Sequence, residues 1–117
     1  ANALLYPDNN SNPFARFDLA KCGRLDFAEV DHMRYPALNL CYQAGRSGAG
    51  MTVVLNAANE IAVEAFLEKK IKFTDIVRTI DKMLAQFPAR QGLSLEEIFD
   101  LDSEVRAKTI ESMECLL

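Results

Sequence analysis

Hydrophobic and polar positions alternate with a helical period through the last two thirds of the chain. Apolar residues recur there at every third or fourth position, which is the spacing of one face of an α-helix. The pattern predicts helices over residues 36–45, 51–69 and 75–87, a short helix over 95–100 and a last helix that begins after Asp102. Brief connections join them, so residues 35–117 are predicted to form an α-helical bundle.

Helix-start residues support these boundaries. Pro36 suits the first position of a helix, because the amide hydrogen that proline lacks has no partner there. Thr74 and Asp102 are predicted N-caps, and Ser94 with Glu97 has the spacing of a capping box. The residues predicted to face inward are Leu38, Leu40, Cys41 and Tyr42 on the first helix, Ile76, Ile80, Met83, Leu84 and Phe87 on the third, and Val105, Ile110, Met113 and Leu116 on the last.

Residues 1–34 have a different pattern. Two prolines and the polar run over residues 8–12 are typical of turns and an extended connector. Its apolar side chains, which are too many for a free linker, are Phe14, Phe17, Leu19, Leu25 and Phe27. The alternation over residues 24–27 predicts a short strand that adds to a sheet lying elsewhere. The predicted fold is therefore mainly α, a C-terminal helical bundle preceded by an extended connector with at most a short strand.

The long helix carries polar side chains within an apolar sequence. At about 100° per residue, Thr52, Asn56 and Asn59 form a stripe that is bordered by apolar residues on both sides. A buried amide without a partner costs roughly 1–3 kcal/mol, so the stripe is predicted to be partly buried and to bond to a neighbouring helix, connector or domain. The edge predicted to be solvated contains Glu60, Glu64 and Glu68.

A metal or substrate site at Asn56, Asn59 and Glu60 is the alternative. Di-metal helical bundles use Glu-x-x-His pairs from different helices, and this chain has a single histidine and no such pair. The structural hydrogen-bonding interpretation is therefore favoured.

Charge and cysteine content narrow the function classes. Thirteen basic and seventeen acidic residues give a net charge of −4 with no dense basic patch, which argues against nucleic acid as a partner. No apolar stretch reaches the length of a membrane span. Cys22, Cys41 and Cys115 lack the spacing of a zinc site, and an odd number of thiols suits a reducing compartment. A soluble, intracellular protein is expected.

The remaining candidate motifs are weak. Residues 45–50 contain three glycines but lack phosphate-loop spacing and follow a helix, so a turn between helices is predicted. His32 beside Asp31 suggests a general base, but a surface or packed histidine is favoured because no nucleophile lies nearby in sequence. Cys41 is predicted to be a buried thiol of ordinary reactivity. The residues therefore predict no catalytic, cofactor-binding or metal site.

Several segments together resemble the C-terminal part of the 1-deoxy-D-xylulose 5-phosphate reductoisomerase family. In chain order they are Ala3-Leu-Leu-Tyr-Pro7, Phe17-Asp-Leu-Ala-Lys21, Leu25-Asp-Phe27, Arg34-Tyr-Pro-Ala-Leu-Asn-Leu40, Leu55-Asn-Ala-Ala-Asn-Glu60, Ala65-Phe-Leu67 and Ile71-Lys-Phe-Thr-Asp-Ile76. Residues 3–76 support the resemblance, while residues 77–117 agree only in being helical and acidic. The polar run over residues 8–12 departs from the basic residue that relatives usually have there.

The resemblance implies a part of an NADPH-dependent enzyme of isoprenoid biosynthesis, which rearranges and reduces 1-deoxy-D-xylulose 5-phosphate to 2-C-methyl-D-erythritol 4-phosphate. Residues 1–34 would be the end of the catalytic domain and the connector, and residues 35–117 the C-terminal bundle. NADPH and a divalent metal, Mg or Mn, would be bound by the missing NADPH-binding and catalytic domains, not by this fragment. The complete enzyme would be a homodimer in the cytoplasm, or in a plastid if the source has one.

Two alternatives remain beside the fragment interpretation, which the start at Ala1 instead of Met also favours. One is a stand-alone helical interaction module that docks through the apolar residues of the connector. The other is a small metalloprotein built around Asn56 and Glu60.

Overall fold

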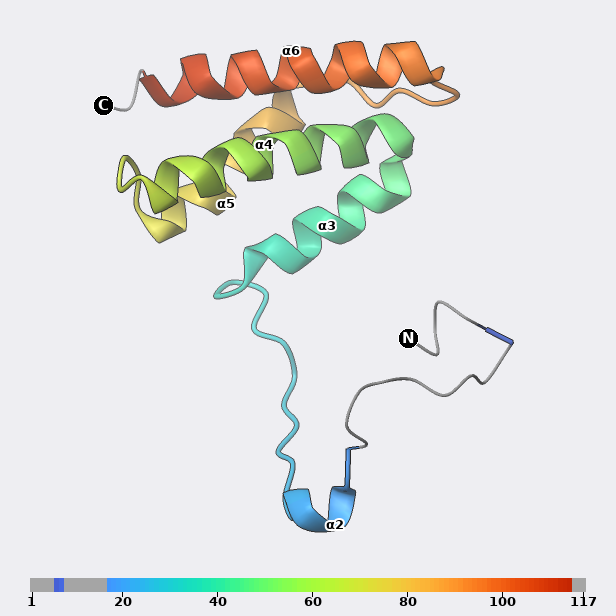
Figure 1. The fold of residues 1–117 in the computed structure, drawn as a ribbon, viewed down its shortest axis with the longest axis vertical. Helices are drawn as coiled ribbons and strands as arrows, with labels where there is room; N and C mark the ends of the chain where they lie inside the picture. Colours follow the sequence, from blue (N-terminus) through green and yellow to red (C-terminus); the bar gives the residue numbers. More distant parts are fainter. Residues whose placement is uncertain (1–5, 8–16, 115–117) are drawn as a thin grey trace.

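The computed structural model describes residues 6–7 and 17–114, and the fold is a set of helices joined by short connections (Figure 1). The helices are α2 (Leu19–Cys22), α3 (Pro36–Ser47), α4 (Ala49–Leu67), α5 (Phe73–Gln86) and α6 (Leu95–Glu114). Within these two described ranges there is no strand, and the predicted mainly α fold is confirmed. Helix α4 is central, because it packs against α3, α5 and α6.

The core is built on a face of small side chains on α4. Ala57, Ala58 and Ala62 are fully buried, and small side chains allow neighbouring helices to approach closely. Larger residues from α5 and α6, above all Met83 and Val105, fill the space beside them and are also fully buried. The predicted inward face of the third helix is confirmed for Ile76, Ile80, Met83 and Phe87, while Leu84 is half-buried.

The junction of α3 and α4 depends on glycine. Helix α3 continues past Gly45 to Ser47, so the predicted end near Gly45 is wrong. The chain instead reverses at Gly48, whose φ of 106° lies in a region that other residues rarely adopt. A Cβ atom on Gly50 would lie 3.0 Å from the carbonyl oxygen of Arg90, which also accepts a hydrogen bond from the Gly50 amide. The glycines therefore form a tight helix junction packed on the α5–α6 connection.

The start of α5 lies two residues earlier than predicted. The helix begins at Phe73, so Thr74 lies inside it and is not the N-cap. The side chain of Asp75 accepts a hydrogen bond from the Lys72 amide at 3.0 Å, which satisfies an open donor at the helix start.

The predicted break before the last helix is wrong, because residues 95–114 form one continuous helix. The Asp102 side chain does not cap a helix but bonds to Arg106 one turn later. The start of α6 is as predicted: the Ser94 amide donates to the Glu97 carboxylate, and the Glu97 amide donates to the Ser94 hydroxyl. The predicted inward position of Leu116 lies outside the described residues.

Helix α3 leaves most of its predicted inward face open. Cys41 and Tyr42 are exposed and Leu40 is half-buried, so the predicted burial of this face is largely wrong. The residue of α3 that is buried is Ala44. Only one edge of α3 therefore packs on the bundle, and no described residue covers the rest.

The connector precedes the bundle as an extended segment with one short turn of helix (Figure 1). Asp18 caps this turn, α2, by accepting hydrogen bonds from the amides of Ala20 and Lys21. The connector's apolar side chains are exposed, with Phe27 at 90% and Met33 at 92% of their accessible surface. Phe14 lies outside the described residues. No helix in the described part of the chain is long and apolar enough to cross a membrane.

Replacing Met83 with Ala should lower the free energy of unfolding by about 2–5 kcal/mol, because it leaves a cavity among fully buried side chains. Met33→Ala removes the same atoms from an exposed side chain and should change stability little. Urea denaturation of the chain and both variants measures the difference. Equal losses for the two variants would contradict this core.

Candidate functional site

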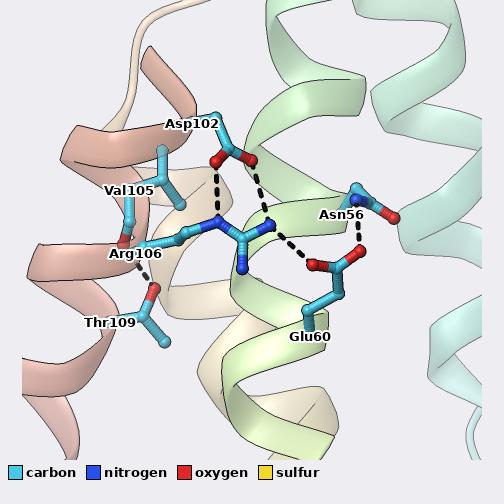
Figure 2. Close-up of polar contacts among 6 residues, drawn as sticks. All are labelled: Asn56, Glu60, Asp102, Val105, Arg106 and Thr109. Carbon is cyan, nitrogen blue, oxygen red and sulfur yellow. Dashed lines mark hydrogen bonds and ion pairs between the residues drawn. The ribbon is translucent and has the colours of Figure 1, made fainter. Parts of the chain in front are cut away.

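A group of polar side chains joins α4 to α6 (Figure 2). The Arg106 guanidinium on α6 donates to Asp102 through Nε at 2.6 Å and through Nη2 at 3.2 Å. The same Nη2 donates across the helix interface to Oε2 of Glu60 on α4 at 2.5 Å. Asn56 Nδ2 donates to the other oxygen of Glu60 at 3.0 Å. We call Asn56, Glu60, Asp102 and Arg106 the α4–α6 polar network.

Helix geometry positions each member of the network. Asn56 and Glu60 are four residues apart on α4, and Asp102 and Arg106 are four apart on α6, so each pair lies on one helix face. The continuity of α6 is essential, because a helix break at Asp102 would remove that pairing. The planar guanidinium offers several donors in a fixed arrangement, which lets one side chain hold two carboxylates.

The charges in the network stabilise one another. The hydrogen bond from Arg106 lowers the pKa of Glu60, and the bond from Asn56 adds to this effect. The bonds to Asp102 and then to Glu60 raise the pKa of Arg106 further above its usual range. The Arg106 side chain is 34% exposed and that of Glu60 is 52% exposed, so water still screens the pair. Both groups are held ionised near neutral pH, and neither suits proton transfer there.

Among the residues that the structure describes, the predicted stripe of Thr52, Asn56 and Asn59 makes hydrogen bonds only within α4, and a bond from the stripe to a further domain stays a prediction. Thr52 is exposed, and its hydroxyl donates to the Ala49 carbonyl of the same helix at 2.7 Å. Asn56 is exposed and Asn59 is half-buried, so partial burial holds only for Asn59. The bond between helices is made by Glu60, which was expected to be only part of a solvated edge.

Sequence reasoning missed the ion pair because its partners are separated by 46 positions. The signal that pointed toward it was the spacing of Asp102 and Arg106, which fits one helix face. The predicted cap at Asp102 concealed that signal. A further missed polar group is Thr109, which is fully buried and whose hydroxyl donates to the Val105 carbonyl at 2.7 Å (Figure 2).

The other candidate residues take no part in a site. His32 is exposed, and the Asp31 carboxylate beside it accepts hydrogen bonds from the amides of Met33 and Arg34, which forms a turn. Cys41 is exposed in this chain, so its predicted burial is wrong. Cys115 lies outside the described residues.

The described residues do not fit a metal or a nucleotide cofactor. In residues 6–7 and 17–114, no three His, Cys, Asp or Glu side chains come together as metal ligands. The carboxylates of Glu60 and Asp102 already accept hydrogen bonds from Arg106. Gly48 and Gly50 pack against the connection at Arg90 and Gln91, so they leave no open phosphate cradle. The polar network therefore connects α4 to α6 by hydrogen bonds and an ion pair.

Fold and site together define a helical bundle in which a polar network joins α4 to α6. The family described as "DXP reductoisomerase C-terminal domain" has a model that matches residues 1–108, and the chain belongs to this family. The match extends the resemblance beyond residue 76 into α6, which includes Asp102 and Arg106.

Individual relatives agree with the family. The 1-deoxy-D-xylulose 5-phosphate reductoisomerase of Chlorobium limicola is 45% identical over 111 residues, which are 95% of this chain and 29% of the relative. The Zymomonas mobilis reductoisomerase solved in complex with NADPH has a TM-score of 0.81 and 40% identity, over 95% of this chain and 29% of that one. A DOX-P reductoisomerase in complex with magnesium has a TM-score of 0.79 and 35% identity, over 99% and 31% of the two chains. The chain thus spans less than a third of these relatives and matches their C-terminal part.

Replacing Arg106 with Met should lower the melting temperature by several degrees, because Glu60 and Asp102 would then face each other without a cation. Arg78→Met removes the same group from an exposed pair within α5 and should have a clearly smaller effect. Thermal unfolding followed by circular dichroism compares the two. Equal melting temperatures of Arg106→Met and Arg78→Met would show that the network does not hold α6 against α4.

Replacing Glu60 with Gln should change how stability depends on pH. Because folding lowers the Glu60 pKa below 4.5, its ionised form stabilises the folded chain above about that pH. This stabilisation should disappear as the pH falls through the lowered pKa. Urea denaturation from pH 7 to pH 3 should show the wild type ahead of Glu60→Gln at neutral pH and level with it in acid. Glu64→Gln, one turn along α4, is the control, and the same pH dependence in both variants would contradict the assignment.

Proposed function

We propose that this chain is the C-terminal part of an NADPH-dependent 1-deoxy-D-xylulose 5-phosphate reductoisomerase, which forms 2-C-methyl-D-erythritol 4-phosphate in isoprenoid biosynthesis. Family membership over residues 1–108 supports the proposal most strongly. Relatives that are 39% to 45% identical bear this enzyme's name. Under this proposal, residues 1–34 are the end of the catalytic domain and the connector, and residues 35–117 are the bundle.

The role of this part is structural: it packs against the catalytic domain and supports its geometry. The connector exposes Phe17, Leu25, Phe27 and Met33, and α3 exposes Tyr42. Burying a large apolar side chain contributes about 1.5–3 kcal/mol, so contact with a further domain would stabilise this arrangement. The polar network lies on α4 and α6, and its task is to keep the bundle rigid behind that contact.

NADPH and the divalent metal, Mg or Mn, belong to the part of the enzyme outside this chain. Solved relatives contain NADPH and magnesium, while the described residues here offer neither a metal-ligand cluster nor a phosphate cradle. The complete enzyme is proposed to be a homodimer in the cytoplasm, or in a plastid of a plastid-bearing source. The exposed thiols of Cys22 and Cys41 suit such a reducing compartment.

A chimera tests the proposal. This chain would replace the matching C-terminal region of the Zymomonas mobilis reductoisomerase, with which it is 40% identical. The chimera should be soluble and should oxidise NADPH in the presence of 1-deoxy-D-xylulose 5-phosphate and Mg²⁺ at a rate within about tenfold of the parent's, because the substituted part makes no contact with the reacting atoms.

Two matched proteins complete the experiment. The parent enzyme truncated at the same position should be inactive or insoluble, which shows that the region is needed. A chimera with an unrelated four-helix domain in its place controls for bulk. If this chain restores no more activity than the unrelated domain does, the chain is a separate interaction module and not a part of the reductoisomerase.

A further inference from the structure

A cavity of about 340 Å³ lies where the C-terminal ends of α4 and α6 meet the connection between α4 and α5 (Figure 1). Its apolar lining comes from all three of these elements and consists of Ile61, Ala65, Ile71, Ile110 and Met113. Ala65 and Met113 are buried, while Ile110 keeps 45% of its surface exposed. Pockets for small molecules usually have volumes of roughly 300–1,000 Å³ and mostly apolar walls, so this cavity has room for a small apolar group.

The polar side chains that line the same cavity are mostly acidic. They are Glu64 on α4, Glu68 and Lys70 in the connection, and Glu114 on α6. Lys70 is already paired with Glu68 at 2.6 Å, and this bond raises the pKa of Lys70. Neither Glu64 nor Glu114 forms an ion pair with any residue in the ranges 6–7 and 17–114. Two carboxylates at the cavity therefore have no cationic partner in the described part of the chain.

The two helices add negative potential at the same place. The C-terminal end of an α-helix carries about half a negative charge, and a cation near it is stabilising. Neither α4 nor α6 has a basic residue in its last turn, and Glu114 is the last residue of α6. A carboxylate is unfavourable at this end of a helix, so a bound cation would offset both the helix dipole and the charge of Glu114.

The chemistry of the lining favours an organic cation over a metal ion. Three glutamates line the cavity, but they do not come together as metal ligands, because the described residues contain no such group. Mg²⁺ and Ca²⁺ need several oxygen ligands at about 2.0–2.6 Å. An ammonium group has three donors, which one carboxylate and water can satisfy, and a hydrocarbon chain attached to it would cover the exposed part of Ile110.

We propose that this cavity is a binding site for a small primary alkylamine. The hydrocarbon chain of the ligand lies on the apolar lining, and its ammonium group binds at the carboxylates of Glu64 and Glu114. The inference goes beyond the proposed function and does not depend on it, because every residue that lines the cavity belongs to this chain.

Titration of the 117-residue chain with straight-chain amines tests the site. The NMR signals of the methyl groups of Ile61, Ile71 and Ile110 should shift with hexylamine and reach saturation. Affinity should rise up to about fourfold for each CH₂ added from propylamine to hexylamine, which is the effect of burying one CH₂. Hexanoate has the opposite charge and should bind at least about tenfold more weakly than hexylamine, because the glutamates and helix ends repel it. Affinity that does not depend on chain length, or equal affinity for hexylamine and hexanoate, would overturn the proposal.

Three charge-neutralising variants locate the ammonium group. Glu64→Gln and Glu114→Gln should each weaken hexylamine binding about threefold, which corresponds to the loss of one partly exposed ion pair. Glu111→Gln removes the same charge from α6 outside the cavity and should leave the affinity unchanged. All three side chains are exposed, so the variants should fold as the wild type does. Equal affinity of the three variants would show that the amine does not bind at these carboxylates.

Two further measurements distinguish other occupants of the cavity. Nα-acetyl-lysine methylamide presents an alkylammonium group on a peptide backbone, as a partner protein would, and it should bind more weakly than hexylamine. Tighter binding would overturn the proposal in favour of a lysine from a partner. A chain shortened to end at Glu114 should bind hexylamine as the 117-residue chain does. Binding by the shortened chain alone would show that residues 115–117 occupy the cavity, which would also overturn the proposal.

Discussion

The close approach of helices to the alanine face of α4 is the constraint on which the rest of the bundle depends. With Ala57, Ala58 and Ala62 fully buried, α4 lies in the middle, and α5 and α6 supply the larger side chains of the core. Apolar contact of this kind is weakly directional, so it leaves the sliding of one helix along another poorly determined. The bond from Arg106 to Glu60 adds direction, because it forms only when α6 has one position along α4.

Apolar packing holds the helices together and the Arg106–Glu60 bond fixes their relative position, which is why a partly exposed ion pair matters here. A surface pair by itself contributes little to stability, since water screens it and both side chains lose freedom. Here the guanidinium is already held by Asp102 on its own helix and Glu60 is held by Asn56, so both partners are oriented before they meet. The network therefore sets the position of α6 along α4, and it also adds to the stability of the bundle.

The sequence predicted the class of the fold and the buried face of α5, because both follow from local periodicity. It failed where a local signal had two meanings. Asp102 is a residue type that favours the N-cap, and it also lies four positions before Arg106, the spacing of an ion pair within one helix. The structure shows the second arrangement, because α6 is continuous and Arg106 bonds to Asp102. Gly45 has the composition of a helix end, but the residue with the positive φ at the end of α3 is Gly48. The link from Glu60 to Arg106 spans 46 positions, which no local rule reaches.

The failed burial prediction for α3 is informative for the same reason. The apolar positions of α3 have a helical period, so the sequence predicts that they lie in a core. In the structure Tyr42 is exposed, and the residue of α3 that is buried is Ala44. The connector joins α3 directly and is likewise apolar and exposed, on the side of the bundle away from α6 (Figure 1). The helical period of apolar residues predicts that a helix face is buried, but it does not identify the element or domain that buries it. The polar network joins α4 to α6 on one side of the bundle, and the apolar residues of α3 and the connector lie exposed on the other.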